Sequence, residues 1–182
     1  MSSEDALQLQ QYGPWAVIAG GSEGVGAEFA ALLARAGVNL VLIARKPGPL
    51  QATAVRCRES GVEVRELTAD LTTDEGVDQI ISGTADLEVG LLIYNAGANT
   101  HSAEFLDGDL AEFQRVIDLN VTTPLRLVHH FGAPMRERRR GGLMLVGSLS
   151  GHLGSARHTG EAGEHGVDGG AVLFDRGAAG IG

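Results

Sequence analysis

The sequence contains very little cysteine, lysine and tyrosine. Its single cysteine, Cys57, excludes an internal disulfide framework and favours a reducing compartment. Its single lysine is Lys46, and its two tyrosines are Tyr12 and Tyr94. The chain has no apolar run long enough to span a membrane, and residues 1–13 lack the basic start and apolar core of a signal peptide. We therefore expect a cytoplasmic protein without membrane segments.

Basic residues are also scarce, with 14 Lys and Arg against 23 Asp and Glu and a formal net charge of −9. This balance argues against broad nucleic-acid binding. The only basic run lies within residues 136–140, and we interpret it as the solvated C-terminal turn of a helix, where cations complement the dipole. No two histidines have the helical spacing of metal ligands, so no metal site is expected.

Glycine is abundant just after the first apolar run, residues 15–19. There Gly20 permits a tight turn, Gly24 lets a pyrophosphate approach the backbone, and Gly26 lets the next helix pack against the strand. The helix N-terminus would offer unpaired N–H groups to the phosphates. The sequence thus predicts a nucleotide site that includes Gly20, Ser22, Glu23, Gly24, Val25 and Gly26.

Apolar strand patterns alternate with helical patterns as far as residue 147. The predicted strands are residues 15–19, 39–44, 63–68, 89–94 and 142–147. The predicted helices are one ending at Gly37, one over 49–59, one starting at Thr73 and a single long helix starting at Asp109. This alternation predicts an α/β fold with a doubly wound parallel sheet, Rossmann-like and incomplete after the fifth strand.

Residues 151–182 differ in character, because ten of the 32 are glycine and their one apolar run is 171–174. Glycine disfavours a helix by about 0.5–1 kcal/mol per residue relative to alanine. We therefore expect a loosely packed tail. A damaged or truncated reading frame explains it better than divergence under selection.

Several motifs in order resemble the short-chain dehydrogenase/reductase family. They are the spacing Gly20-x-x-x-Gly24-x-Gly26, Asp70-Leu71, Tyr94-Asn95-Ala96-Gly97, Asn120-Val121 and Gly147-Ser148. Ala19 stands where the family usually has threonine, and Tyr94 stands at the first position of the family's Asn-Asn-Ala-Gly. The resemblance covers roughly residues 14–151. It implies a dinucleotide-binding domain over 14–150, with an N-terminal extension at 1–13 and an aberrant glycine-rich tail at 151–182.

The resemblance also implies roles for single residues. Asp70, with Leu71 beside it, would touch the adenine, although an Asp between strand and helix often serves only in a turn. The residues that would line the cofactor near its ribose are Asn95, Ala96 and Gly97. Asn120 would hold the proton-relay end of the site, and Ser148 would hydrogen-bond a substrate carbonyl, with Ser150 as the competing candidate.

The family's Tyr-x-x-x-Lys pair has no counterpart in these 182 residues. In one register Gly160 and Glu164 stand at the Tyr and Lys positions, and one residue later Glu161 and His165 do. Neither pair restores the chemistry, because the tyrosine donates the proton and the lysine lowers its pKa. His165 is the only plausible substitute acid.

Arg45 and Lys46 follow the second strand, where the adenosine ribose of a dinucleotide should lie. A carboxylate there would accept the ribose 2′-hydroxyl, whereas a cation suits a 2′-phosphate. The pair therefore favours NADP over NAD, with a solvated loop pair as the alternative.

Three hypotheses follow from the sequence. The first is an NADP-dependent oxidoreductase by descent, which transfers hydride between nicotinamide and a small carbonyl or alcohol substrate. The second is an NADP-binding module without turnover, and the third is a non-functional gene fragment. We expect essentially no turnover, and no homo-oligomer of the family type, because the later helices are missing.

Overall fold

The computed structural model describes residues 12–97, 103, 105–147 and 171–174. These residues build a six-stranded sheet with the order β3-β2-β1-β4-β5-β6, in which the first five strands are parallel. The five strands are β1 (Trp15–Ala19), β2 (Asn39–Ala44), β3 (Val64–Thr68), β4 (Val89–Tyr94) and β5 (Gly142–Val146). The predicted doubly wound parallel sheet is confirmed.

A sixth strand, β6 (Ala171–Phe174), extends the sheet beyond the point where the sequence predicted its end. The parallel part does end with β5, but β6 pairs with β5 in antiparallel orientation. An edge strand offers unpaired backbone N–H and C=O groups, and the only apolar run of the tail pairs with them. The rest of the predicted tail, and residues 1–11 of the predicted N-terminal extension, lie outside the described residues.

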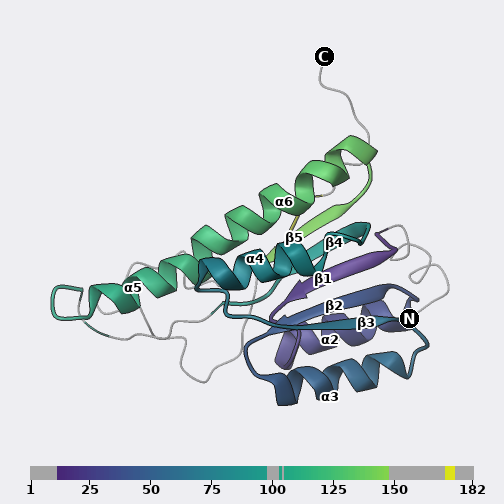
Figure 1. Cartoon of the computed structure of the whole chain (residues 1–182), viewed down its shortest axis with the longest axis horizontal. Coiled ribbons are helices and arrows are strands. Elements are labelled where there is room, and N and C mark those ends of the chain that lie inside the picture. Colours follow the sequence, from purple (N-terminus) through teal and green to yellow (C-terminus); the bar gives the residue numbers. More distant parts are fainter. Residues whose placement is uncertain (1–11, 98–102, 104, 148–170, 175–182) are drawn as a thin grey trace.

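Helices cover both faces of the sheet (Figure 1). One face carries α2 (Gly24–Arg35) and α3 (Pro47–Arg58). The other carries α4 (Asp74–Gly83) and α6 (Thr123–Arg138), while α5 (Leu110–Ile117) continues the line of α6 beyond the sheet. Alternate strand residues enter two separate cores, so Ile18 packs on the α2 side and Val17 on the α6 side. The central strands are thus buried on both faces, as parallel strands require.

The predicted helix ends are largely confirmed. Gly37 has a φ of 82° just after α2, and the Thr73 side chain accepts a hydrogen bond from the amide of Gly76 at 3.1 Å. One start was wrong, because α3 begins at Pro47 and not at Pro49. Proline suits the first helical position, where an N–H has no intrahelical partner to lose.

The inner face of α2 is formed mostly by small side chains. Val25 and Leu32 are 44% and 39% exposed, and the buried positions are mostly alanines, such as Ala30 and Ala34. Small side chains let the helix axis approach the sheet closely. Of its large apolar residues, Leu33 is buried, and Phe29 is partly buried against the same core.

The long helix predicted from Asp109 begins where expected, and the Asp109 side chain accepts a hydrogen bond from the amide of Ala111. A π-helical turn, η1 (Asp118–Thr122), interrupts it and separates α5 from α6. The amide of Thr123 donates to the carbonyl of Asp118, five residues earlier. Pro124 follows directly and has no N–H to donate to any helix carbonyl. The helical pattern continues through this turn, so hydrophobic periodicity does not reveal it.

The basic run at the end of α6, within residues 136–140, is less solvated than predicted. Arg138 donates to the carbonyl of Val89, and Arg140 pairs with Glu88 at 2.6 Å. Arg139 adopts the left-handed conformation, with a φ of 55°. Two of these arginines therefore tie the end of α6 to the start of β4.

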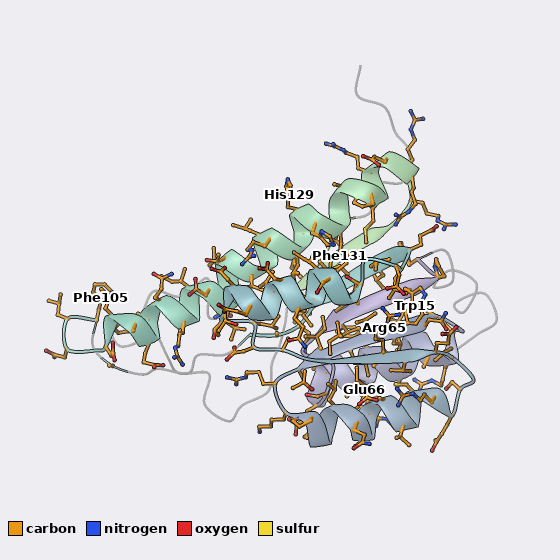
Figure 2. All side chains as sticks on the ribbon, viewed as in Figure 1. Trp15, Arg65, Glu66, Phe105, His129 and Phe131 are labelled. Atoms are coloured by element: carbon orange, nitrogen blue, oxygen red, sulfur yellow. The ribbon has the colours of Figure 1, made fainter. Side chains whose placement is uncertain are left out.

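A second arginine, Arg65 of β3, makes contacts at the end of the sheet opposite the glycine turn. Its guanidinium group stands over the ring of Trp15, 5.9 Å from the ring centroid (Figure 2). Arg65 also makes a bidentate pair with Asp86, at 2.7 and 2.9 Å. These contacts connect β3, β1 and the segment before β4 at the end of the sheet opposite the glycine turn.

Candidate cofactor-binding site

The carboxyl ends of β1 and β4 lie side by side at the point where the strand order reverses. From β1 the chain enters the glycine turn and α2 on one face of the sheet. From β4 it passes toward α5 and α6 on the other face. Open α/β sheets bind ligands in the crevice that forms at such a switch point.

The three glycines of the turn have different surroundings. A Cβ on Gly20, which has a φ of +80°, would lie 2.8 Å from the amide nitrogen of Ala96. A Cβ on Gly26 would lie 2.0 Å from the carbonyl oxygen of Gly20. Gly24 has a φ of +55°, and no atom lies within 4 Å of its Cβ position. Gly20 and Gly26 therefore permit packing, whereas Gly24 borders open space.

The first turn of α2 leaves backbone amides without a helical acceptor. Its first helical hydrogen bond runs from Ala27 to the carbonyl of Glu23 at 3.3 Å, and the Glu23 side chain makes no capping bond. The amides of residues 24–26 precede that bond and have no helical acceptor. On α3, the buried Thr53 donates to the carbonyl of Ser22 at 2.8 Å and so holds the turn in place.

The loop after β4 is bonded directly to the glycine turn. The amides of Asn95 and Ala96 both donate to the carbonyl of Ala19 at 2.9 Å. The Asn95 side-chain amide donates to the carbonyl of Gly20 at 3.3 Å. The structure thus brings the predicted residues of these two segments together.

Asp70 lies in the loop after β3, and one of its carboxylate oxygens accepts from the amide and the hydroxyl of Thr72, at 3.0 and 2.8 Å. Burial tends to raise the pKa of Asp70, but these bonds and the charges of Arg45 and Arg115 outweigh it and lower the pKa. Asp70 therefore has a role in the turn, and its contact with an adenine stays a prediction. Leu71 is 4% exposed, so its side chain belongs to the core.

Arg45 and Lys46 directly follow β2 and are exposed. Lys46 is the residue that precedes α3, and its side chain makes no capping bond. Because β2 is the neighbour of β1, both cations lie at the same edge of the sheet as the glycine turn. The Asp70 loop follows β3, the next strand along this edge.

Of the two predicted catalytic residues, the structure describes Asn120 but not Ser148. Asn120 lies in the π turn η1 and donates from its side-chain amide to the carbonyl of Val116 at 2.8 Å. Its side-chain oxygen lies 3.2 Å from the Cβ position of Gly97. Asn120 therefore stands beside the end of the β4 loop.

Two residues that the sequence analysis did not assign to the site connect its loops. The Tyr94 hydroxyl donates to the carbonyl of Leu119 in η1 at 2.6 Å, and burial raises the pKa of Tyr94 above its usual range. The Thr123 hydroxyl donates to the carbonyl of Leu71 at 2.7 Å. The departure from the family's Asn-Asn-Ala-Gly at Tyr94, together with Pro124, was the available signal.

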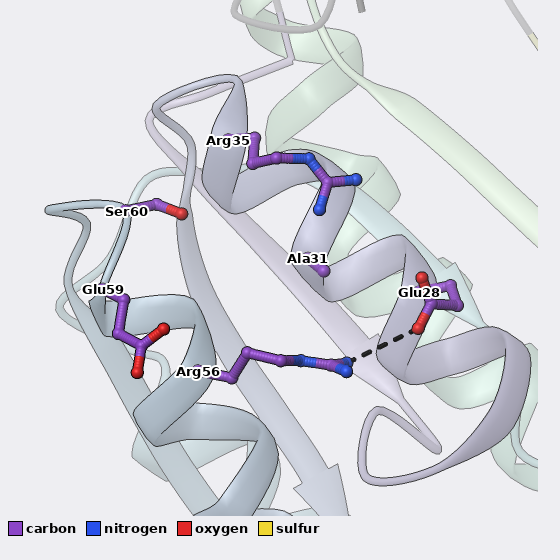
Figure 3. Close-up of a pocket in the computed structure, with 6 residues that line it drawn as sticks. All are labelled: Glu28, Ala31, Arg35, Arg56, Glu59 and Ser60. Carbon is purple, nitrogen blue, oxygen red and sulfur yellow. Dashed lines mark ion pairs between the residues drawn. The ribbon is translucent and has the colours of Figure 1, made fainter.

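A hollow of about 250 Å³ lies elsewhere, between α2 and α3 (Figure 3). It is lined by Glu28, Ala31, Arg35, Arg56, Glu59 and Ser60. Arg56 pairs with Glu28 across it at 3.7 Å. Its two arginines are matched by two glutamates, and it lies on the outer helices, away from the strand ends.

Within residues 12–97, 103, 105–147 and 171–174, no group of three or more His, Cys, Asp or Glu side chains is placed to hold a metal ion. In the same part of the chain, no helix has the length and apolar character needed to cross a bilayer.

Comparison with known proteins shows the family, because the protein-family model described as short chain dehydrogenase matches residues 14–160. The chain belongs to the short-chain dehydrogenase family. An NAD(P) cofactor, a small-molecule substrate and oxidoreductase activity are typical of this family.

Three relatives illustrate the match. The 7beta-hydroxysteroid dehydrogenase of Clostridium sardiniense is 32% identical over 143 residues, which cover 78% of this chain and 54% of that protein. The very-long-chain 3-oxoacyl-CoA reductase of Podospora anserina is 36% identical over 159 residues, which cover 84% and 46%. A short-chain dehydrogenase from Sphingobium yanoikuyae, solved with NADPH, is 36% identical with a TM-score of 0.71, covering 77% and 56%. The chain spans about half the length of the curated relatives it matches.

Proposed function

We propose that the carboxyl edge of this sheet binds NADP, as the cofactor-binding part of an oxidoreductase that acts on a small carbonyl or alcohol. The observation that carries the proposal is the contrast within the glycine turn. Gly20 and Gly26 pack the turn against the β4 loop, whereas no atom lies within 4 Å of the Cβ position of Gly24, the first residue of α2. Backbone amides at a helix N-terminus are a ready-made site for a pyrophosphate.

Two exposed cations support the choice of NADP over NAD. Arg45 and Lys46 follow β2 at the edge where the adenosine ribose would lie, and no acidic residue occupies either position. A charge-assisted hydrogen bond contributes about 1.5–3 kcal/mol, which corresponds to roughly tenfold or more in affinity. The NADPH in the solved relative from Sphingobium yanoikuyae is compatible with this choice.

Titration of the chain with NADPH and NADH, followed by nicotinamide fluorescence, tests both parts of the proposal. We expect NADPH to bind about tenfold or more tightly than NADH. Arg45→Ala should remove most of that preference, because the 2′-phosphate loses its cation. Arg35→Ala is the matched control, since it removes the same charge from the opposite end of α2. Equal affinity for the two cofactors would refute NADP specificity, and no binding of either would refute the site.

A specific observation favours binding without turnover in these 182 residues. The Tyr94 hydroxyl is buried and already donates to Leu119, so it is a poor proton donor for a substrate. The only lysine, Lys46, lies at the start of α3. Absorbance at the NADPH band, followed over a panel of ketones and aldehydes, should stay constant. Oxidation of NADPH that Ser148→Ala abolishes would contradict this.

A further inference from the structure

The π turn η1 contacts both loops that border the candidate cofactor site. Asn120, within the turn, lies beside Gly97 of the β4 loop. Thr123, directly after it, donates to the carbonyl of Leu71 in the β3 loop at 2.7 Å and is 3% exposed. A π turn carries one more residue than an α-turn, so its loss would rotate one side of the helix relative to the other.

In this turn, the carbonyl of Leu119 receives no hydrogen bond from a helix N–H. The amide of Thr123 donates to Asp118, five residues back, and is therefore not given to Leu119 as an α-helix would require. The next residue, Pro124, has no N–H. The carbonyl of Leu119 thus depends on a donor from outside the helix, because a buried carbonyl without a partner costs free energy.

Tyr94 supplies that donor from the middle of the fold. Its ring is 3% exposed in the same core as Leu119, and its hydroxyl reaches the carbonyl at 2.6 Å. Tyr94 also directly precedes Asn95, whose side chain holds the glycine turn. One strand end therefore fixes both the glycine turn and the π turn.

We propose that Tyr94 is a positioning residue of the cofactor site, whose hydroxyl maintains the π turn through Leu119 and so keeps Asn120 and Thr123 against the two loops. This inference rests on the proposed NADP site. It adds a residue that touches neither the cofactor nor a substrate, and it assigns a function to the tyrosine that replaces the family's asparagine.

The first test compares two variants that each lose one buried hydroxyl-to-backbone bond. Tyr94→Phe removes the bond to the carbonyl of Leu119. Thr84→Val removes the bond from Thr84 to the carbonyl of Ile80, at the C-terminal end of α4. Both should lower the urea midpoint to a similar extent. Only Tyr94→Phe should weaken NADPH binding, by about fivefold or more, whereas Thr84→Val should change it by less than about twofold. Unchanged affinity in folded Tyr94→Phe would overturn the proposal.

The second test separates positioning from stability. In Tyr94→Phe combined with Pro124→Ala, residue 124 regains an N–H that can serve the helix. We expect the urea midpoint to recover while NADPH affinity stays low, because a regular α-helix places Asn120 and Thr123 differently. Affinity that recovers together with stability would show that Tyr94 is only structural. This combined variant also covers the case in which Tyr94→Phe alone does not fold.

Amide hydrogen exchange without cofactor keeps the inference distinct from the proposed function. Tyr94→Phe should speed exchange at residues 118–123 far more than in β1, because the π turn loses its external bond. If the unmodified chain fails to bind NADPH, the proposed function fails, but accelerated exchange in this segment still supports the role of Tyr94 in the turn. Unchanged exchange there would refute that role whatever the cofactor does.

Discussion

Gly26→Ala should be the most damaging single methyl addition in the glycine turn. The new Cβ would lie 2.0 Å from the carbonyl oxygen of Gly20 and 2.8 Å from the side-chain nitrogen of Asn95. Both contacts are closer than any real Cβ contact, and the nearer atom is backbone, so no change of rotamer relieves it. The turn itself must move, and the hydrogen bond from Asn95 to Gly20 must lengthen or break.

The expected magnitude of the Gly26→Ala effect follows from three contributions. Overpacking against backbone costs about 3 kcal/mol, at the upper end of its usual range. The lost hydrogen bond adds about 1 kcal/mol. Alanine in the first turn of α2 returns at most about 1 kcal/mol of helix propensity. We therefore expect the free energy of unfolding to fall by about 3–4 kcal/mol.

Urea unfolding with matched glycine variants tests this reasoning. Gly132→Ala in α6 is the control, because its Cβ would meet only Leu143 at an ordinary 3.5 Å, and it should gain about 0.5–1 kcal/mol. Gly24→Ala should lose about 1–2 kcal/mol through its positive φ alone, since nothing lies near its Cβ. It should nevertheless abolish NADPH binding, because the methyl group enters the open space. Gly26→Ala as stable as the unmodified chain would refute the close packing of the turn.

Two further predictions concern the other face of the sheet. Thr123→Val should lower the free energy of unfolding by about 1–3 kcal/mol, measured by urea unfolding, because it leaves the carbonyl of Leu71 without its donor, whereas Thr123→Ser should retain most of the stability. Burial and the charge of the neighbouring histidine lower the pKa of His130 in the folded chain. Stability that depends on neutral His130 is therefore present above the unfolded pKa of 6.5 and is lost as the pH falls through the lower folded pKa. His130→Gln should therefore lose less stability than the unmodified chain between about pH 7.5 and about pH 5.5, and equal losses in urea midpoint would contradict this.

The sheet could be predicted from the sequence because its signals are local. The strands over 15–19, 39–44 and 89–94 have the predicted bounds, since each is a continuous apolar run between turn residues. The glycine turn was equally clear, because its spacing and its place between strand and helix occur together. Fold and cofactor edge therefore follow from short segments.

The missed features depend on contacts between distant segments. The π turn needs Tyr94 and Leu119, which are 25 residues apart, and no periodicity in either segment indicates that they meet. The partners of Arg138 and Arg140 at the start of β4 lie 49 and 52 residues away in sequence. Antiparallel pairing of β6 is likewise a property of the edge it joins. Sequence reasoning identified these residues only as helical, basic or apolar.

The loops at the candidate site are held by side chains that donate to backbone carbonyls. Thr53 holds the glycine turn, Asn95 joins it to the β4 loop, and Thr123 holds the β3 loop. The acceptors are main-chain atoms, so their chemistry is unchanged when the acceptor residue is substituted, whereas each donor is a single replaceable group. Loss of any of these donors should therefore weaken cofactor binding, because the loop that it holds is displaced. Because all three donors lie within residues 53–123, binding at this edge can be tested separately from any chemistry that needs Ser148 or residues beyond it.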